Sequence, residues 1–335
     1  MEKYFIGGNT AYGFRSFYDG ELARCENVIL MKGAPGTGKS TLLKTIGKEC
    51  AVRGIDHELW YCSGDPESVD GIYIKELRAA VVDATAPHPC DAALPVIRER
   101  IVDMASAMDR GVLLPRKERI QSLINYKKGC YARAYDKLKC AFCHFRRAEE
   151  AYAERADICA IRREAAAFVL RESGGREYAD AGRNAFCRAI TPAGEAAFYD
   201  YLLGKRVYEI KGTETGARVF LGEAARLLPE AFVLHHPLCP ERIDAVVTGD
   251  YVITSDAGAF SSPADKIELG DAERGACEVC EEHLARCADR IKSAVNDLAS
   301  AKTAHAEIEK IHATAMDFSV TDGIVERVKH MIFGE

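Results

Sequence analysis

The chain has 335 residues, of which 48% are hydrophobic and 29% are charged, so we expect a globular protein with room for two domains, and a disordered chain is excluded. Its formal net charge of −6 gives no general reason to expect a nucleic acid as a partner. No apolar run approaches the roughly 18 residues that span a bilayer, and residues 1–10 lack the features of an export signal, so we expect a cytoplasmic protein that does not contact a membrane.

The most informative segment lies between residues 27 and 46, where a short apolar strand leads into an amphipathic helix. The junction is a complete G-x-x-x-x-G-K-[ST] pattern followed by a threonine: Gly33, Ala34, Pro35, Gly36, Thr37, Gly38, Lys39, Ser40 and Thr41. Glycines let consecutive backbone N–H groups turn toward one anion, and the helix N-terminus adds its positive end. The pattern therefore predicts a phosphate-binding loop for ATP (or GTP), and an ordinary glycine-rich turn is the alternative.

The polar residues of this loop have expected roles toward a bound nucleotide. Lys39 reaches the β- and γ-phosphates as a catalytic cation, Ser40 binds Mg²⁺, and Thr41 touches the α-phosphate. Residues 79–82 predict another buried strand, which ends in Asp83. An acid at this place orients Mg²⁺ directly or through a water, so we assign Asp83 to catalysis and to the metal, together with Ser40.

A polar loop, residues 63–71, follows a strand predicted at 58–62. Ligands of open α/β sheets lie beyond such strand ends, so Asp65 is a catalytic candidate that positions a metal or a water. An aspartate that forms a turn before proline is the alternative. Ala84, and not a glutamate, follows Asp83, so an attacking water must be positioned elsewhere. The candidates for that role are Asp65, Glu67, Asp70 and His88.

Residues 117–172 have helical periodicity and carry two apolar stripes separated by a phase shift, which we interpret as a hairpin of two helices. The first stripe consists of Tyr131, Tyr135, Leu138, Phe142 and Phe145. Basic residues are in excess here, but no groove-reading motif accompanies them, so nucleic acid is not favoured. A solvated face, or a face for the acidic start of a second arm, explains the charge more simply, and the arms also offer a surface to a protein partner.

The 13 cysteines are an odd number in a chain without an export signal, so we interpret them as free thiols. Two pairs, Cys140/Cys143 and Cys277/Cys280, have the spacing of metal ligands. Both lie in helical patterns and lack the turn residues of a zinc knuckle. Buried structural thiols are the favoured interpretation, and a shared zinc site is the alternative.

The two halves of the chain resemble each other in sequence. Phe5, Thr10 and Gly13 fall on Phe186, Thr191 and Gly194, and the match continues, in order, through Asp136 on Asp289 as far as Glu154 on Glu307. Such order predicts a tandem duplication. We place a phosphate-loop domain at residues 1–176, with its helical arm at about 116–173, and a second domain at 183–335, with its arm at about 271–315.

The second copy has lost the residues that the chemistry needs. Ala217 replaces Gly38, Arg218 replaces Lys39, and Val219 replaces Ser40. The alanine Cβ lies where the loop must approach phosphate, and valine cannot bind Mg²⁺. We therefore expect a degenerate domain without hydrolysis. Asp256 is the candidate counterpart of Asp83, while Arg188 and Arg218 are candidates to complete the first site from the second copy.

These motifs together resemble a family of bacterial tandem P-loop proteins, mostly from clostridia-like bacteria, that are named only as ATPases or nucleotide kinase-like proteins. The resemblance rests on residues 7–14, on the loop at 33–41, on the segments 63–71 and 83–88, and on the duplicated arms. It implies a nucleotide-binding fold without a known substrate. Many members keep a P-loop in both halves, and this sequence departs from them in the second.

We thus expect an α/β protein made of two P-loop NTPase-like parallel-sheet domains, each with a helical hairpin arm. The leading hypothesis is a Mg²⁺-dependent ATPase whose site lies in the N-terminal half. A kinase for a small molecule or nucleotide is a second hypothesis, and a nucleotide-dependent switch without hydrolysis is a third. The kinase would need lid arginines, for which the arms offer Arg116, Arg119, Arg146 and Arg147.

Overall fold

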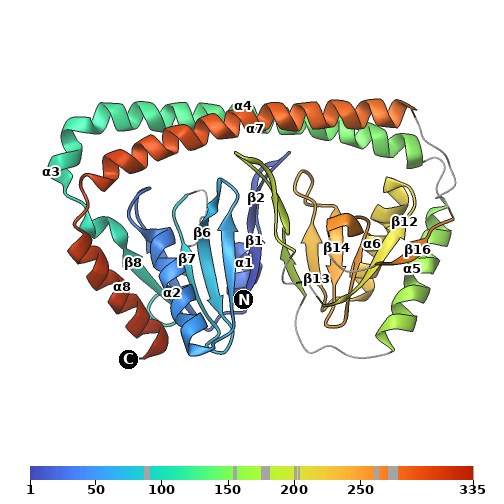
Figure 1. Ribbon diagram of the computed structural model, residues 1–335, viewed down its shortest axis with the longest axis horizontal. Helices are drawn as coiled ribbons and strands as arrows, with labels where there is room; N and C mark the ends of the chain where they lie inside the picture. Colours follow the sequence, from blue (N-terminus) through green and yellow to red (C-terminus); the bar gives the residue numbers. More distant parts are fainter. Residues whose placement is uncertain are drawn as a thin grey trace.

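The computed structural model describes residues 1–86, 91–153, 157–174, 182–199, 202, 204–259, 264–270 and 278–334. Two α/β units lie side by side, and two long helices run across both of them (Figure 1). Each unit contains a six-stranded sheet with parallel and antiparallel pairs. The α/β class expected from the sequence is therefore confirmed.

The sheet of the first unit is parallel at its two sides and antiparallel in its centre. Its strands in spatial order are β1 (Glu2–Phe5), β5 (His57–Cys62), β6 (Asp65–Ile74), β7 (Ala79–Asp83), β4 (Asn27–Lys32) and β8 (Glu99–Asp103). β6 runs antiparallel to both neighbours, whereas the other pairs are parallel. The expectation of a parallel sheet is wrong for this centre, because two residues join β5 to β6 and four join β6 to β7. A parallel connection needs about a dozen residues.

The sheet of the second unit has the same strand order and the same strand directions. In the matching order its strands are β9 (Arg183–Ala185), β13 (Phe232–His235), β14 (Ile243–Val247), β15 (Tyr251–Thr254), β12 (Arg206–Lys211) and β16 (Ala264–Glu268). Each strand thus has a counterpart at the same place in the other unit, and β4 corresponds to β12.

The two units meet where β1 and β9 end. Phe5 and Phe186 donate their backbone N–H groups to each other's carbonyl oxygens, both at 2.9 Å. A hairpin follows in each half, made of β2 (Gly7–Thr10) and β3 (Gly13–Ser16) or of β10 (Arg188–Thr191) and β11 (Gly194–Ala197). A single buried cluster, which includes Trp60 and Leu234, spans the junction. The units therefore share a buried cluster at their junction, and each unit also has a separate cluster of its own.

The two long helices are α4 (Lys117–Ala153) and α7 (Glu278–Ala313), which pack antiparallel along their length (Figure 1). Leu138 and Ala141 of α4 are buried against Ala294 and Leu298 of α7. Ion pairs follow the seam, as between Arg133 Nε and an Asp297 carboxylate oxygen at 3.0 Å. The two helices expected within residues 117–172 are present, as α4 and α5 (Ile158–Ser173). The hairpin expected inside each half is wrong, because the apolar stripe of α4 is covered by α7 of the other half of the chain.

The last helix of each half belongs to the opposite unit. α5 (Ile158–Ser173) packs on α6 (Glu214–Leu227) of the second unit, where the rings of Phe168 and Phe220 are 5.9 Å apart. α8 (Phe318–Phe333) packs on α2 (Lys39–Arg53) of the first, where Ile324 joins the cluster that contains Leu43. The packed units therefore differ from the sequence ranges expected as domains. The shorter helices are α1 (Tyr18–Ala23) and α3 (Arg110–Leu113).

Candidate functional site

The glycine-rich loop joins β4 to α2 in the first unit, as its sequence predicts. Gly36 and Gly38 have φ angles of 82° and 85°, in the left-handed region that residues with a Cβ avoid. α2 begins at Lys39, and Gly38, at its N-cap, has no side chain to cap the first turn. The helix therefore presents backbone N–H groups to the loop, which is the arrangement that receives an anion.

Lys39 is folded over this loop and is only 8% exposed. Its Nζ donates hydrogen bonds to the carbonyl oxygens of Gly33 and Ala34, both at 2.9 Å. The same Nζ lies 3.5 Å from a carboxylate oxygen of Asp83. The cation is thus held above the loop, between its carbonyl groups and the acid at the end of β7.

Asp83 reaches the loop because β7 lies directly beside β4, with Asp83 opposite Met31 in the parallel register. Its other carboxylate oxygen accepts a hydrogen bond from the backbone N–H of Thr85 at 2.9 Å. Thr85 in turn donates its hydroxyl to the carbonyl oxygen of Gly33 at 3.0 Å. The sequence did not lead us to predict Thr85 as a site residue. Its position two residues after Asp83 was the signal that could have indicated it.

Ser40 and Asp83 are the oxygen donors that suit Mg²⁺ at this place. Ser40 Oγ accepts the backbone N–H of Val69 at 3.0 Å, which ties the start of α2 to β6. In the described part of the chain there is no group of three histidine, cysteine or acidic side chains that fits a metal ion. A hydroxyl, one carboxylate and the phosphates of a nucleotide are nevertheless a usual Mg²⁺ set, so these residues fit the ion. Thr41 is exposed on the first turn of α2.

Asp65 does not lie in an open polar loop, because β6 begins at this residue. Its carboxylate accepts hydrogen bonds from Lys302 Nζ of α7 at 2.8 Å and from the Ser68 hydroxyl at 3.0 Å. Burial raises the pKa of Asp65, but these hydrogen bonds outweigh it, and the net pKa lies below the ordinary value. Asp65 therefore connects β6 to α7, and among the described residues neither of these bonds joins it to the β4–α2 loop.

The remaining candidates to position a water are Glu67, Asp70 and His88, and the two that the structure describes lie in different environments. The carbonyl oxygen of Glu67 accepts a hydrogen bond from Lys44 Nζ at 2.6 Å. Asp70 is buried beside Cys62, whose thiol pKa is raised well above the ordinary value by burial first and then by this acid. His88 lies outside the described residues.

Two helices from the C-terminal half cover the phosphate loop. A Cβ on Gly36 would meet the carbonyl oxygen of Glu309 at 2.9 Å, so α7 touches the loop backbone directly. His312 Nδ1 lies 2.8 Å from the carbonyl oxygen of Pro35. The Thr321 methyl group of α8 lies 3.5 Å from the place of a Cβ on Gly38. No local pattern in the sequence indicated these three contacts, because they join residues 273 to 283 positions apart.

The matching junction of the second unit contains no such loop. α6 begins at Glu214, and the Thr213 side chain caps it by accepting the N–H of Gly216 at 3.1 Å. Ala217, which corresponds to Gly38, is buried inside this helix. The strand register places Thr254 opposite Glu209 as it places Val82 opposite Leu30, so the counterpart of Asp83 is Ser255 and not Asp256.

Neither arginine expected to complete the first site makes its contacts there. Arg188 Nη2 pairs with Asp244 at 2.7 Å, and Arg218 Nε pairs with Glu149 at 3.2 Å. Three of the four arm arginines have partners on the arms: Arg116 donates to the Thr314 hydroxyl and Arg119 to Glu307, while Arg146 pairs with Glu150. These contacts hold the long helices together or lie at the second unit.

The cysteine pairs form no metal site in the described residues. Cys140 and Cys143 are exposed on α4, so the expectation of buried thiols is wrong for this pair. Cys280 is buried, and Cys277 lies outside the described residues. No described helix is long and apolar enough to cross a membrane. Comparison with protein-family models, with curated proteins and with solved structures gives no match to this chain.

Proposed function

We propose that the first unit binds a magnesium nucleoside triphosphate at the β4–α2 loop and hydrolyses its terminal phosphate. The observation that carries the proposal is the position of Lys39, 2.9 Å from the Gly33 carbonyl and 3.5 Å from Asp83. The Lys39 ammonium group is hydrogen-bonded to carbonyl oxygens of the loop, and it can turn from them toward phosphate oxygens when a nucleotide enters. Bound Mg²⁺ would neutralise charge that develops between the phosphates.

Different residues around this loop would bind the phosphates, hold the metal ion and position its ligand. The left-handed glycines turn backbone N–H groups toward the phosphates, and Ser40 and Asp83 would hold the metal ion. Thr85 fixes the carboxylate of Asp83 through its backbone N–H, and it also fixes the loop through Gly33. The geometry therefore supplies positioning and charge, which is most of what phosphoryl transfer requires from a protein.

We further propose that the chain arose by tandem duplication and that the second unit is a catalytically inactive copy. The support is the shared strand order of the two sheets and the contact of the matching residues Phe5 and Phe186 at their junction. In the second unit the phosphate loop is replaced by an extra helical turn that Thr213 caps. Its first N–H groups are therefore partly used by the protein itself.

The proposal is tested by phosphate release from ATP and GTP with Mg²⁺, using Lys39→Ala beside its counterpart Arg218→Ala. Lys39→Ala should lower turnover by about 10²–10³-fold, because one preorganised cation is lost. Arg218→Ala should turn over like the original protein. Equal losses in both variants, or none in Lys39→Ala, would refute the assignment, whereas nucleotide binding without phosphate release would favour the switch.

A kinase is the second candidate, because an open cavity lies along α7, the helix whose Glu309 backbone touches the loop at Gly36. It would show phosphate transfer only when an acceptor is present.

A further inference from the structure

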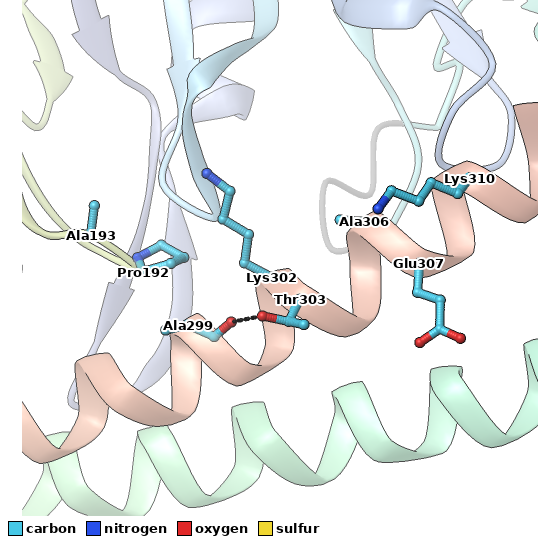
Figure 2. Close-up of a pocket in the computed structure, with 8 residues that line it drawn as sticks. All are labelled: Pro192, Ala193, Ala299, Lys302, Thr303, Ala306, Glu307 and Lys310. Carbon is cyan, nitrogen blue, oxygen red and sulfur yellow. Dashed lines mark hydrogen bonds between the residues drawn. The ribbon is translucent and has the colours of Figure 1, made fainter.

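A cavity of about 650 Å³ runs along α7 between this helix and the tip of the β10–β11 hairpin. Its lining residues are Pro192, Ala193, Ala299, Lys302, Thr303, Ala306, Glu307 and Lys310 (Figure 2). The volume is in the range of small-molecule sites, which combine apolar walls with a few polar groups. From Ala299 to Lys310 the cavity follows the helix for about 16 Å.

The cavity runs along α7, the helix that covers the glycine-rich loop. At one point, Lys302 contacts Asp65 at the start of β6, and the same strand bonds Ser40 through Val69. At its end, Lys310 follows Glu309, whose backbone touches Gly36. A molecule in this cavity would therefore lie next to the helix that contacts the loop.

The charges that line the cavity favour an anion. Lys302, Lys310 and Glu307 all line the cavity. Lys302 extends from α7 toward the first unit and Lys310 lies along α7 toward Ala306, whereas Glu307 points toward α4 (Figure 2). Glu307 is also engaged, because it accepts a hydrogen bond from Arg119 Nε at 3.0 Å. Lys310 is exposed and has no ion pair among the residues that the structure describes. The cavity is thus lined by Lys302, which is paired with Asp65, and by Lys310, which has no ion pair among the described residues. Both lie beside a wall that is rich in alanine.

The second unit has a corresponding cavity, and its differences are informative. The two hairpin tips are built alike: Thr10 and Thr191 each donate their hydroxyl to the carbonyl of the glycine three residues on, at 2.8 and 2.7 Å. This match makes Tyr12 the counterpart of Ala193. Tyr12 packs edge-on against Phe142, which lines the second cavity, and that cavity has only about 310 Å³.

The helix residues of the two cavities differ as well. With Asp136 matched to Asp289, Arg146 corresponds to Ala299 and Glu149 to Lys302. The unit that keeps the phosphate loop therefore has the larger cavity, lined by two lysines and one glutamate, while the smaller cavity of the other unit is lined by three arginines and three glutamates. This correlation links the cavity to the chemistry of the phosphate loop.

We infer that the cavity binds a second ligand, a small organic anion with a phosphate or carboxylate group. The charged group would lie near Lys302 and Lys310, and the apolar part would rest on Ala299, Ala306 and the hairpin tip. The role of this anion as an acceptor next to the terminal phosphate rests on the proposed nucleotide site. The binding itself does not depend on it.

Pyridoxal 5′-phosphate is a suitable probe, because it is an aromatic phosphate whose aldehyde condenses with a lysine amine and releases water. The resulting imine is fixed with cyanoborohydride, and the labelled peptides are identified by mass spectrometry. Lys310 should be labelled at least about tenfold faster than Lys139, an exposed lysine on α4, because a second cation concentrates the phosphate. Equal rates at the two lysines would overturn the inference.

Substitutions at Lys302 and at Ala193 test separately the charge of the cavity and the space inside it. Lys302→Ala should slow the labelling of Lys310, and Lys302→Arg should restore it. Ala193→Tyr, which introduces the residue of the second unit, should also slow it without any change in charge. If labelling of Lys310 is indifferent to all three substitutions, the cavity does not hold the probe.

The experiment also distinguishes this inference from the proposed function. Labelling should persist in Lys39→Ala, and saturating Mg²⁺ and ATP should not abolish it in the original protein. Complete protection by the nucleotide, lost in Lys39→Ala, would mean that the nucleotide itself fills the cavity, which overturns a separate ligand but supports the phosphate loop. Selective labelling of a protein that binds no nucleotide would leave the anion site standing and refute the nucleotide site.

Discussion

The β4–α2 and β12–α6 junctions occupy the same place in two sheets of the same strand order, but only the first is an open loop. Gly36 and Gly38 adopt left-handed angles there. At the corresponding positions the second unit has Thr215 and Ala217, which favour right-handed backbone, so α6 starts earlier and closes the junction. Two side chains thus decide whether the same topology yields an open glycine-rich loop or an ordinary capped helix.

The largest predicted effect tests the exchange of helices between the units. Phe168→Ala should cost about 3–5 kcal/mol and Ile324→Ala about 2–5 kcal/mol of unfolding free energy, because both side chains are fully packed. Hydrogen exchange should then rise first in α6 for Phe168→Ala and first in α2 for Ile324→Ala. The reverse pattern would mean that each terminal helix stabilises its own half.

Gly36→Ala tests whether the left-handed backbone and the contact with α7 restrain the β4–α2 loop. The strained φ angle should cost about 1–3 kcal/mol, and the new Cβ would also press on the backbone of Glu309. Gly13→Ala is the matched control, since Gly13 has a φ of 86° but no atom within 4 Å of the added Cβ. Chemical denaturation and nucleotide binding should show a greater loss in Gly36→Ala. Identical losses would mean that α7 does not restrain the loop.

The units should also differ in their response to acid. His236 of the second unit accepts the N–H of Leu238 on Nδ1 and stacks on Phe145. Burial first, and then Arg242 and Arg188, lower its pKa well below 6.5. The unfolded chain therefore binds the proton first, and stability should fall as the pH drops below 6.5, by up to about 1.4 kcal/mol per pH unit for this group.

The position of His236 corresponds to Cys62 in the first unit, which does not titrate in this range because burial raises its thiol pKa. His236→Asn keeps an acceptor near Nδ1 but cannot be protonated there. Denaturation curves between pH 7 and 5 should be flatter for this variant. An unchanged slope would assign the acid sensitivity to other groups.

The smallest expected effect concerns the ion pair between Asp65 and Lys302, whose side chains are 33% and 39% exposed. Asp65→Asn should cost about 0.2–1 kcal/mol at neutral pH, because solvent screens such pairs. The pKa of Asp65 is lowered from 3.8, so the contribution of the pair is present at neutral pH and is lost as the pH falls below 3.8. A double-mutant cycle with Lys302→Ala measures the coupling, and a coupling well above 1 kcal/mol would contradict this account.

The sequence by itself determined the local features of the molecule. The apolar strands before the loop and before Asp83, the start of α2 at Lys39 and the loss of the loop in the second half all follow from residues close to one another in the chain. Their physical causes are equally local: the freedom of glycine, the cap of a helix and the alternation of buried residues.

Only the tertiary structure decided which long segments meet. The stripe on α4 fits a hairpin partner within its own half as well as it fits α7, and periodicity alone does not distinguish them. The exchange of α5 and α8, the contact of Glu309 with Gly36 and the cavity beside Lys310 all depend on that choice of partner. They arise because packing energy is gained between surfaces, wherever in the chain those surfaces originate.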